Sequence, residues 1–530
     1  MNKLNTRTNQ GILFTDQYQL TMAQLYYRMG LHELTAQFDH FYRRNPDYSE
    51  PNYAHKAGYC INAGLESLVH WMQQTRFCPV DIEYMRRMQT NTGAQLFAND
   101  FLVWLAEHGH FGNISLQAVP EGRVIHPNTP LTVVQGPLAM AQILETALLN
   151  YLNYPILVAT KAARVAHSAG GNPVLEFGLR RGQEQGANAG TRAALIGGAG
   201  FTSNAGVSHS MGIPPEGTHA HSMIQLFMSL GLGELGAFQA YADLYPDDCL
   251  LLVDTVDTLG SGVPNAIQVF EKLQRKGHKP VGVRLDSGDL AALSIKTAKL
   301  LNDAGFEDVS IVLSSDLDEL AILRICEHIA KHATQHGQDA DHVINRLVYG
   351  VGTRLVTSWG EPALGGVYKI VAVKHGNEWK SAVKISENPI KTPNPGQKRL
   401  WRLYDQAGMA MVDLVALVHE TPNTATNIVL NNPLDGTTMQ TIDRSALGQI
   451  ELMLQDVFVD GQLIYELPEL TSMRSQREAD MVRLPAGVKE IESPAPYPVA
   501  ISPALWQFKS ALMNEVKPPI ANRRLTKETG

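Results

Sequence analysis

Cysteine is scarce in this chain of 530 residues, and it shows no spacing typical of a metal site or a disulfide framework. The four cysteines are scattered, at Cys60, Cys78, Cys249 and Cys326. Residues 1–6 hold no apolar signal core, and no apolar run reaches the about 18 residues that cross a bilayer. These absences exclude a zinc ribbon and a membrane-spanning protein, and we expect a reducing, cytoplasmic compartment.

Charge of one sign does not dominate the sequence. The 44 basic residues stand against 52 acidic ones, the net charge is −8, and no basic arm or charge run is present. We therefore predict neither a nucleic-acid partner nor a membrane surface as partner. With 44% hydrophobic and 18% charged residues the chain can bury a large core, and its length predicts two or three domains.

The middle of the chain contains a regular series of strand-like and helix-like segments. Apolar strands are predicted at 249–254, 280–286, 309–314 and 346–350, and helical patterns lie between them at 264–276, 288–303 and 316–331. The strand ends lie roughly 30 residues apart, the length of a β-α unit, which favours a parallel sheet or barrel. In such folds ligands bind at the carboxyl ends of the strands.

The flanking regions have other patterns. A helix is predicted over 16–29, a strand over 36–44, and one or two helices over 138–168 with an interruption near Pro155. After about residue 365, two β-hairpins are predicted, at 367–385 and 399–417.

Together these patterns predict an α/β fold, an irregular parallel β/α barrel with an additional α+β domain built from N-terminal and post-barrel antiparallel strands. The N-terminal domain is expected at 1–140, the barrel at 141–365, and an antiparallel return segment with a C-terminal extension at 366–530.

Two histidines, His219 and His221, lie two apart after a Gly- and Pro-rich loop. In an extended segment side chains alternate, so only one of the two rings faces a given side. This favours one working histidine over a two-histidine clamp. A core role is the usual fate of a lone histidine, but Asp254 follows at a strand end, and a carboxylate that accepts one imidazole N–H makes the other nitrogen a better nucleophile.

Other strand ends carry residues suited to an anionic, ring-bearing ligand. Phe177 beside Arg180 can stack on a flat ring and pair with an anion. Asp286 can hold ribose hydroxyls or Mg²⁺, and Gly350 and Gly352 leave bare amides that can approach a phosphate.

Ordinary structural roles compete with these readings. Asp289 and the segment 314–316 are also good helix caps. The glycine cluster at 197–200 has amides that could hold an anion, but the cluster alone is a weak signal.

In these residues the chain resembles the nicotinate phosphoribosyltransferase family, which commits nicotinic acid to NAD synthesis. The resemblance rests on six ordered segments, at 14–18, 176–181, 217–222, 284–289, 314–318 and 349–353. It covers roughly residues 12–405, and no counterpart is assigned to the segment beyond about residue 420.

The resemblance implies an enzyme that joins nicotinate to phosphoribosyl pyrophosphate, with ATP and Mg²⁺, as a homodimer with shared active sites. It implies that ATP phosphorylates His221, that Asp254 orients it, and that Asp286 holds the ribose. The pyridine ring would be sandwiched between Phe177 and the partner subunit's Tyr18. The remaining implied substrate contacts come from Arg180, Ser203, Arg284, Ser314, Ser315, Gly350, Gly352 and Thr353, while Mg²⁺ would be bound mainly through substrate phosphates.

Three alternatives stay open at the level of sequence. A nicotinamide phosphoribosyltransferase is disfavoured by Ser203, because the related nicotinamide enzyme carries an aspartate there, which can accept from an amide. A metal-dependent barrel hydrolase would use His219 and His221 as ligands, but later strand ends lack further histidines. A non-catalytic sensor on the same fold is disfavoured by the intact His221, Asp254 and Asp286.

Overall fold

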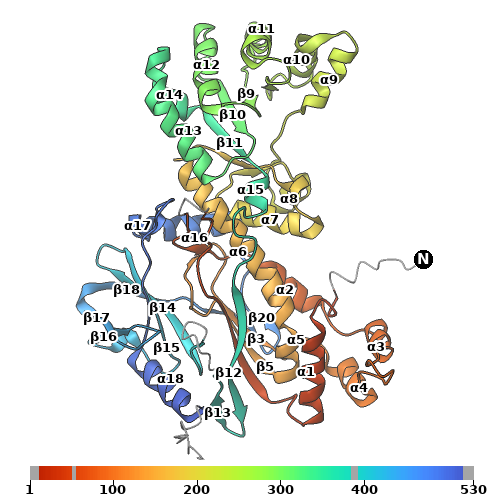
Figure 1. Ribbon diagram of the computed structural model, residues 1–530, viewed down its shortest axis with the longest axis vertical. Coiled ribbons are helices and arrows are strands. Elements are labelled where there is room, and N and C mark those ends of the chain that lie inside the picture. The colour runs from red at the N-terminus through yellow and green to blue at the C-terminus, as the bar shows by residue number, and fades with distance from the viewer. Residues whose placement is uncertain (1–10, 50–54, 384–391, 517–530) are drawn as a thin grey trace, which may run out of the picture.

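Six parallel strands form the sheet of the upper lobe in the computed structural model, which describes residues 11–49, 55–383 and 392–516 (Figure 1). Across the sheet the strands are β7 (Phe201–Thr202), β6 (Val174–Glu176), β11 (Leu347–Val351), β10 (Ser310–Ser314), β9 (Gly282–Leu285) and β8 (Leu250–Leu252). The α/β prediction is confirmed. The sheet is an open half-barrel, with β7 and β8 as its edges.

Helices alternate with these strands, as the spacing predicts. They are α7 (Glu184–Gly197), α8 (Ala205–Met211), α9 (His221–Ser229), α10 (Gly233–Leu244), α11 (Val263–Arg275), α12 (Leu290–Asp303), α13 (Glu319–His332), α14 (Ala340–Asn345) and α15 (Thr353–Val356). The Asp289 side chain accepts from the Ala292 N–H, and Asp318 accepts from the Ala321 N–H. Both therefore cap the helices they precede, so the capping role of Asp289 is confirmed.

A seven-stranded antiparallel sheet joins the N-terminal strands to the strands that follow the half-barrel. In order they are β13 (Glu378–Ser381), β12 (Gly366–His375), β1 (Thr35–Tyr42), β5 (Thr132–Pro137), β3 (Ser115–Ala118), β19 (Gln455–Val459) and β20 (Gln462–Leu463). Because β1 pairs with both β12 and β5, the predicted pairing of N-terminal and post-barrel strands is confirmed. The end of the hairpin predicted at 367–385 lies outside the described residues.

A second sheet occupies the other half of the lower lobe, and it is antiparallel except where β15 pairs with β21 in parallel. It contains β17 (Thr438–Asp443), β16 (Asn427–Asn431), β21 (Val499–Ile501), β15 (Ala410–Leu417), β14 (Lys398–Asp405) and β18 (Leu447–Leu452). The predicted hairpin at 399–417 is β14 and β15. Three helices accompany it, α16 (Leu470–Arg483), α17 (Ala486–Lys489) and α18 (Pro503–Val516).

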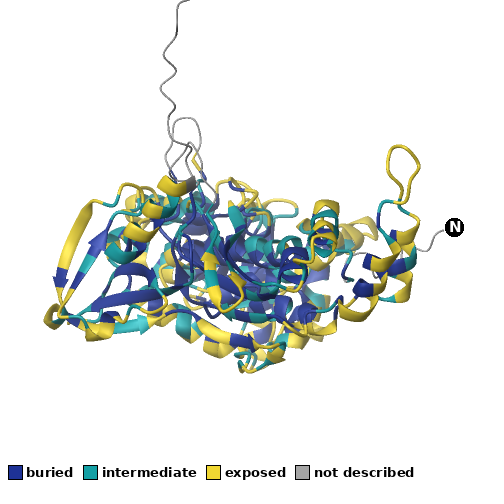
Figure 2. Ribbon diagram, turned by 90° about the horizontal axis from the view of Figure 1, so that it is seen from below, coloured by how far each residue is buried: buried dark blue, intermediate teal, exposed yellow. Residues whose placement is uncertain are grey.

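The long helix α6 joins the two lobes. The N-terminal helices are α1 (Gln17–Arg28), α2 (Leu65–Gln74), α3 (Pro79–Arg86), α4 (Asn99–His108), α5 (Leu138–Ile143) and α6 (Glu145–Ser168), and the small ladder of β2 (Cys60–Ile61) with β4 (Val124–Ile125) lies beside them. Leu152 and Ile156 of α6 belong to the lower core, whereas Val158 and Ala162 belong to the upper one. Figure 2 shows buried residues running through the middle of the molecule.

The predicted interruption near Pro155 is wrong, because α5 and α6 meet at Leu144 and Pro155 lies inside α6. Proline cannot donate to the carbonyl of Tyr151 four residues earlier. The backbone of Gly64 packs directly against that carbonyl, where any side chain would overlap it. Close packing therefore holds the helix together at the proline.

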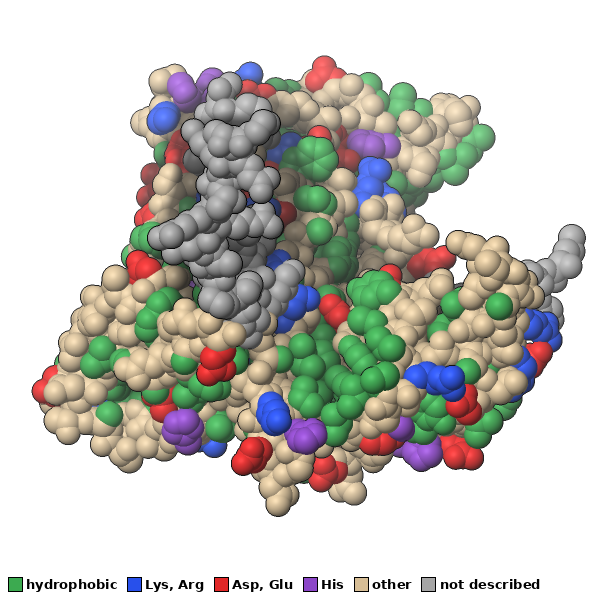
Figure 3. Space-filling view, turned by 60° about the horizontal axis from the view of Figure 1, so that its bottom comes forward, with side chains coloured by type: hydrophobic (Ala, Val, Ile, Leu, Met, Phe, Trp, Pro, Cys, Tyr) green, Lys and Arg blue, Asp and Glu red, His purple; other side chains and the backbone are tan. Residues whose placement is uncertain are grey.

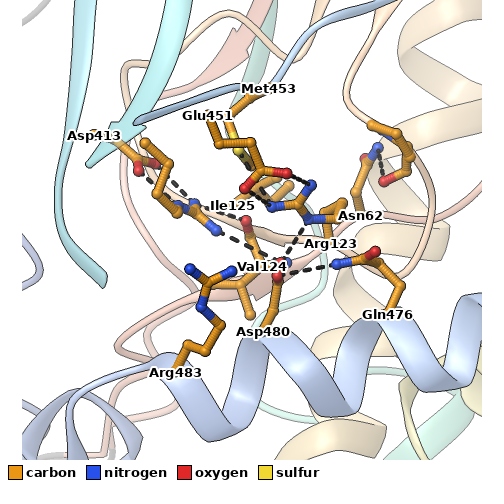
Figure 4. Close-up of polar contacts among 12 residues, drawn as sticks. Asn62, Arg123, Val124, Ile125, Asp413, Glu451, Met453, Gln476, Asp480 and Arg483 are labelled. Atoms are coloured by element: carbon orange, nitrogen blue, oxygen red, sulfur yellow. Dashed lines mark hydrogen bonds and ion pairs between the residues drawn. The ribbon is translucent and has the colours of Figure 1, made fainter. Parts of the chain in front are cut away.

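Buried ion networks join segments from the N-terminal, middle and C-terminal regions of the chain. Arg123, next to β4, donates to Asp480 of α16 at 2.8 Å and to Glu451 of β18 at 2.8 Å (Figure 4). Arg402 of β14 pairs with Asp413 of β15 at 2.7 Å. Since removing one partner of a buried pair leaves an uncompensated charge, such networks strongly specify the arrangement of these elements.

A second network lies at the start of α13. The fully buried carboxylate of Glu319 pairs with Lys161 at 2.9 Å, Arg164 at 3.1 Å and His55 at 3.2 Å. Burial alone would raise the pKa of Glu319, but Lys161, the hydrogen bond from His55 and Arg164 outweigh burial and hold it well below its usual range.

The outer surface shows no field of one sign on the face seen in Figure 3, where acidic, basic and histidine side chains are interspersed. Among the described residues, no helix combines the length and apolarity needed to cross a membrane.

Replacing Glu319 with glutamine should destabilise the protein by about 3–5 kcal/mol, because Lys161 and Arg164 stay buried without a counter-charge. The depressed pKa means that the carboxylate stabilises the fold at every pH above its unfolded value near 4.5 and loses this effect as the pH falls through the folded value. Melting curves should show a lower Tm for E319Q from pH 6 to pH 8, with the deficit narrowing only in acid. The exposed Glu83→Gln is the matched control and should melt like the wild type; an equal loss in both variants would contradict the prediction.

Candidate active site

The carboxyl ends of the parallel strands enclose a pocket of about 250 Å³. It is lined by Phe177, Arg180, Arg181, Ser203, Gly217, Arg284, Asp286, Ser314, Ser315, Asp316, Gly350, Gly352 and Thr353. The structure thus brings together all the predicted substrate-contacting residues except Tyr18. They converge because each follows, or ends, a neighbouring strand of one sheet.

One side of the pocket is a network around Asp286. The Ser314 hydroxyl donates to its carboxylate at 2.6 Å, and Arg284 donates to it at 3.1 Å and to the Ser314 oxygen at 2.9 Å. Burial alone would raise the pKa of Asp286, but the Ser314 hydrogen bond and Arg284 outweigh it and lower the pKa. A charged acceptor and a guanidinium are therefore held side by side, as hydroxyl and phosphate groups require.

An aromatic ring lies beside this network. The Arg284 guanidinium carbon lies 5.6 Å from the centre of the Phe177 ring. A side chain on Gly350 would meet the ring at 2.6 Å, so this glycine lets Phe177 pack against β11. The sequence predicts that the Gly350 amide approaches a phosphate. The close approach of Phe177 is a second reason for glycine at this position, and it does not exclude the first.

A buried carboxylate next to Phe177, that of Glu176, holds three segments together, a role that no motif in the sequence indicates. Glu176 accepts from the Gly178 N–H, from the Thr191 hydroxyl of α7 at 3.0 Å and from the Thr202 hydroxyl of β7 at 2.6 Å. It thereby fixes the loop after β6, one helix and the strand that leads to Ser203. Its only sequence signal is an acidic residue at the end of an apolar strand.

The two histidines point to different sides, as predicted, although the cause differs. His219 lies in the extended segment and His221 begins α9. The His219 ring packs edge-on against Tyr241 and accepts from the Leu252 N–H at 3.2 Å. Burial lowers the pKa of His219 to about 4, so its ring is neutral at pH 7.

The His221 ring faces the carboxyl edge of the sheet. Its Nε2 lies 3.6 Å from Asp286 and 3.9 Å from Asp254, and its Nδ1 lies 2.9 Å from the Thr255 hydroxyl. Thr255 therefore orients the ring here, and no pattern in the sequence singles it out. Asp254 instead accepts from the Asp286 N–H at 2.9 Å and from Ser287 at 2.6 Å, which joins the ends of β8 and β9.

Tyr18 does not reach this pocket within one chain. It is 53% exposed on α1 and lines a separate hollow with Asp16, Asn153 and Tyr154. If Tyr18 acts on a ligand in the pocket, it acts from another copy of the chain.

The glycine cluster at 197–200 does not offer free amides. The N–H groups of Gly198 and Ala199 donate to Ala194, and that of Gly200 donates to Val174. The anion-binding reading of this cluster is therefore wrong. The cluster is the C-terminal end of α7, where carbonyl groups rather than N–H groups lack helical partners.

A metal centre built from protein side chains is not supported. Among the described residues, no group of three or more His, Cys, Asp or Glu side chains is arranged to hold a metal ion. Since the rings of His219 and His221 face different sides, they cannot share one ion.

Comparison with known proteins matches most of the chain to one family. Family models match for the nicotinate phosphoribosyltransferase N-terminal domain at 13–153, for the family itself at 174–407 and for its C-terminal domain at 397–509. The last match extends the resemblance past residue 420, so the narrower extent inferred from sequence is wrong.

Individual relatives agree with the family models. The nicotinate phosphoribosyltransferase of Bacillus subtilis is 37% identical over 507 residues, covering 95% of this chain and 96% of the relative. The human one is 32% identical over 553 residues, covering 94% and 96%. A crystal structure of human nicotinic acid phosphoribosyltransferase superposes with a TM-score of 0.77 at 29% identity, over 94% of this chain and 99% of that one.

Proposed function

This chain belongs to the nicotinate phosphoribosyltransferase family, and from that membership we propose that it forms nicotinate mononucleotide and pyrophosphate from nicotinate and phosphoribosyl pyrophosphate. The observation that supports this most directly is the single pocket that is lined both by the Phe177 ring and by the Asp286, Arg284 and Ser314 network. A flat ring and a phosphorylated sugar would meet there. The reaction would be the first step of NAD salvage from nicotinate.

The proposed bond change follows from this placement. The pyridine nitrogen attacks C1 of the ribose, the bond from C1 to the pyrophosphate oxygen breaks, and its electron pair leaves with pyrophosphate. Phe177 stacks on the pyridine ring, while Arg180 and Arg284 compensate the carboxylate and phosphate charges. Asp286 accepts from a ribose hydroxyl, and the segments at Ser314–Ser315 and Gly350–Thr353 hold the 5′-phosphate.

Mg²⁺, when bound to the substrate, would neutralise the developing charge on pyrophosphate. The carboxylates among the residues that line the pocket are Asp286 and Asp316, and carboxylate oxygens are hard donors. With so few protein ligands, the substrate phosphates would supply most of the coordination.

Coupling to ATP is proposed to pass through His221. A ring nitrogen attacks the γ-phosphorus of ATP, ADP leaves, and water later cleaves the phosphohistidine. The added charge would lie beside Asp286 and so change how substrate and product bind. His219 is unsuited to this step, because it is turned toward Tyr241.

A homodimer with shared sites is proposed from the position of Tyr18. Its ring is exposed and distant from its own pocket, yet the family resemblance assigns it to the base. The four free cysteines suit a reducing, cytoplasmic compartment.

The function is tested by product formation with nicotinate or nicotinamide as the base. We expect kcat/KM for nicotinate to be higher by about 10- to 100-fold, the factor that a charge-assisted hydrogen bond of roughly 1.5–3 kcal/mol supplies. Ser203→Asp should lower the nicotinate value through charge repulsion, and Ser203→Ala controls for the loss of the hydroxyl. Equal values for the two bases would refute the acid preference, and the absence of product with either base would favour a non-catalytic sensor.

Phosphorylation is tested by incubating the protein with γ-labelled ATP and mapping the acid-labile label. We expect label on His221 and none in His221→Ala, which should lose ATP stimulation but retain weak ATP-independent turnover. His219→Gln, whose amide oxygen can replace the acceptor for Leu252, should still be labelled. Label on His219, or label that persists in His221→Ala, would show that the assignment is wrong.

Shared sites are tested by mixing two defective subunits. Tyr18→Ala should weaken nicotinate binding by up to roughly tenfold, because aromatic stacking contributes about 0.5–1.5 kcal/mol. A dimer of one Tyr18→Ala and one His221→Ala subunit would have one site with both lesions and one with neither, so ATP-stimulated activity should partly return. Monomers in light scattering, or no recovery despite proven subunit exchange, would rule the shared site out.

A further inference from the structure

Arg474 of α16 holds the C-terminal end of α7 from outside the half-barrel. Its Nε donates to the Leu195 carbonyl at 2.9 Å, and one terminal nitrogen donates to Ala199 at 2.6 Å and Gly200 at 2.9 Å. Carbonyl groups at a helix C-terminus lack helical donors and carry the negative end of the helix dipole. A guanidinium with three carbonyl partners therefore fixes the end of α7 and the turn after it.

Arg477, one turn further along α16, completes this contact. It donates to the Gly197 carbonyl at 3.0 Å. Gly198 has a φ of 130°, and a side chain there would overlap the Arg477 guanidinium. Gly198 thus makes room for Arg477, which comes from the C-terminal part of the chain.

The turn leads directly to one wall of the pocket. It continues into β7, an edge strand of two residues that pairs with β6. Ser203 follows at once, with its N–H bonded to the Glu176 carbonyl at 3.0 Å. Glu176 holds this short strand from the side of the sheet, and the preceding turn holds it where the chain enters.

The helix that supplies the arginines is itself anchored on its other side. Asp480 accepts from Arg123 at 2.8 Å, as Figure 4 shows, and pairs with Arg402 of β14 at 3.5 Å. α16 therefore connects the second sheet of the lower lobe to the wall that carries Ser203.

We propose that Arg474, supported by Arg477, is a positioning residue for base recognition, which holds Ser203 at its distance from Phe177. The C-terminal segment thereby takes part in substrate selection without touching the substrate. This inference rests on the proposed function, because it takes nicotinate as the ligand between Phe177 and Ser203.

The test compares Arg474→Met with Arg483→Met, the same change on the same helix but away from α7. R474M should raise the KM for nicotinate by about tenfold, the effect of losing one well-aligned charge-assisted hydrogen bond, while the KM for phosphoribosyl pyrophosphate stays the same. Its preference for nicotinate over nicotinamide should fall as well. R483M should leave both KM values and the preference unchanged.

A measurement without substrate accompanies the kinetics. In the ligand-free protein, hydrogen exchange of the amides of residues 198–203 should be about tenfold faster in R474M and unchanged in R483M. If R474M does not fold, Arg474→Lys replaces it and should show a smaller change of the same kind, because one ammonium cannot reach all three carbonyls.

The outcomes separate this inference from the proposed function. A wild-type chain that does not turn over nicotinate overturns the proposed function. Unchanged exchange in R474M, an unchanged nicotinate KM, or an equal rise of both KM values overturns the positioning role, because the last indicates general loosening of the protein.

Discussion

The pocket depends on one buried carboxylate, that of Glu176, which ends β6. It accepts hydrogen bonds from its own loop, from α7 and from β7, and among the described residues no cationic side chain pairs with it. N–H and O–H donors are directional, so each of the three segments is held in place rather than merely attracted. Losing one such partner in a buried site costs about 1–3 kcal/mol. Phe177 is the next residue in the chain, so these hydrogen bonds also fix its position.

Elsewhere in the molecule, buried ion pairs between side chains hold segments in place. The networks of Arg123 with Asp480 and of Glu319 with Lys161 join segments that are 357 and 158 residues apart in sequence. Buried pairs add little net stability, but a wrong pairing would leave a bare charge, so they specify which segments meet. The apolar helix α6 supplies continuity between the lobes, and the ion networks fix how the remaining parts are arranged around it.

Much of the fold and of the pocket could be predicted because the signals are local. Strand and helix periods revealed the β-α series, and parallel strands place their carboxyl ends at one edge, so Asp286, Ser314 and Gly350 had to meet. Other features have no local signal. Thr255 belongs to no motif in the sequence, and only the structure places its hydroxyl beside the His221 ring. Arg474 lies 279 residues from the carbonyl it holds, and Pro155 looks like a helix breaker because the compensating backbone of Gly64 is distant in sequence.

Gly350 affects the position of Phe177 because it has no side chain. It makes no side-chain contact, yet the Phe177 ring lies where a methyl group would be, at 2.6 Å. The position of the Phe177 ring in the pocket wall therefore depends on an excluded volume and not on an attraction. Even a methyl group on Gly350 would force the ring or the backbone of β11 to move.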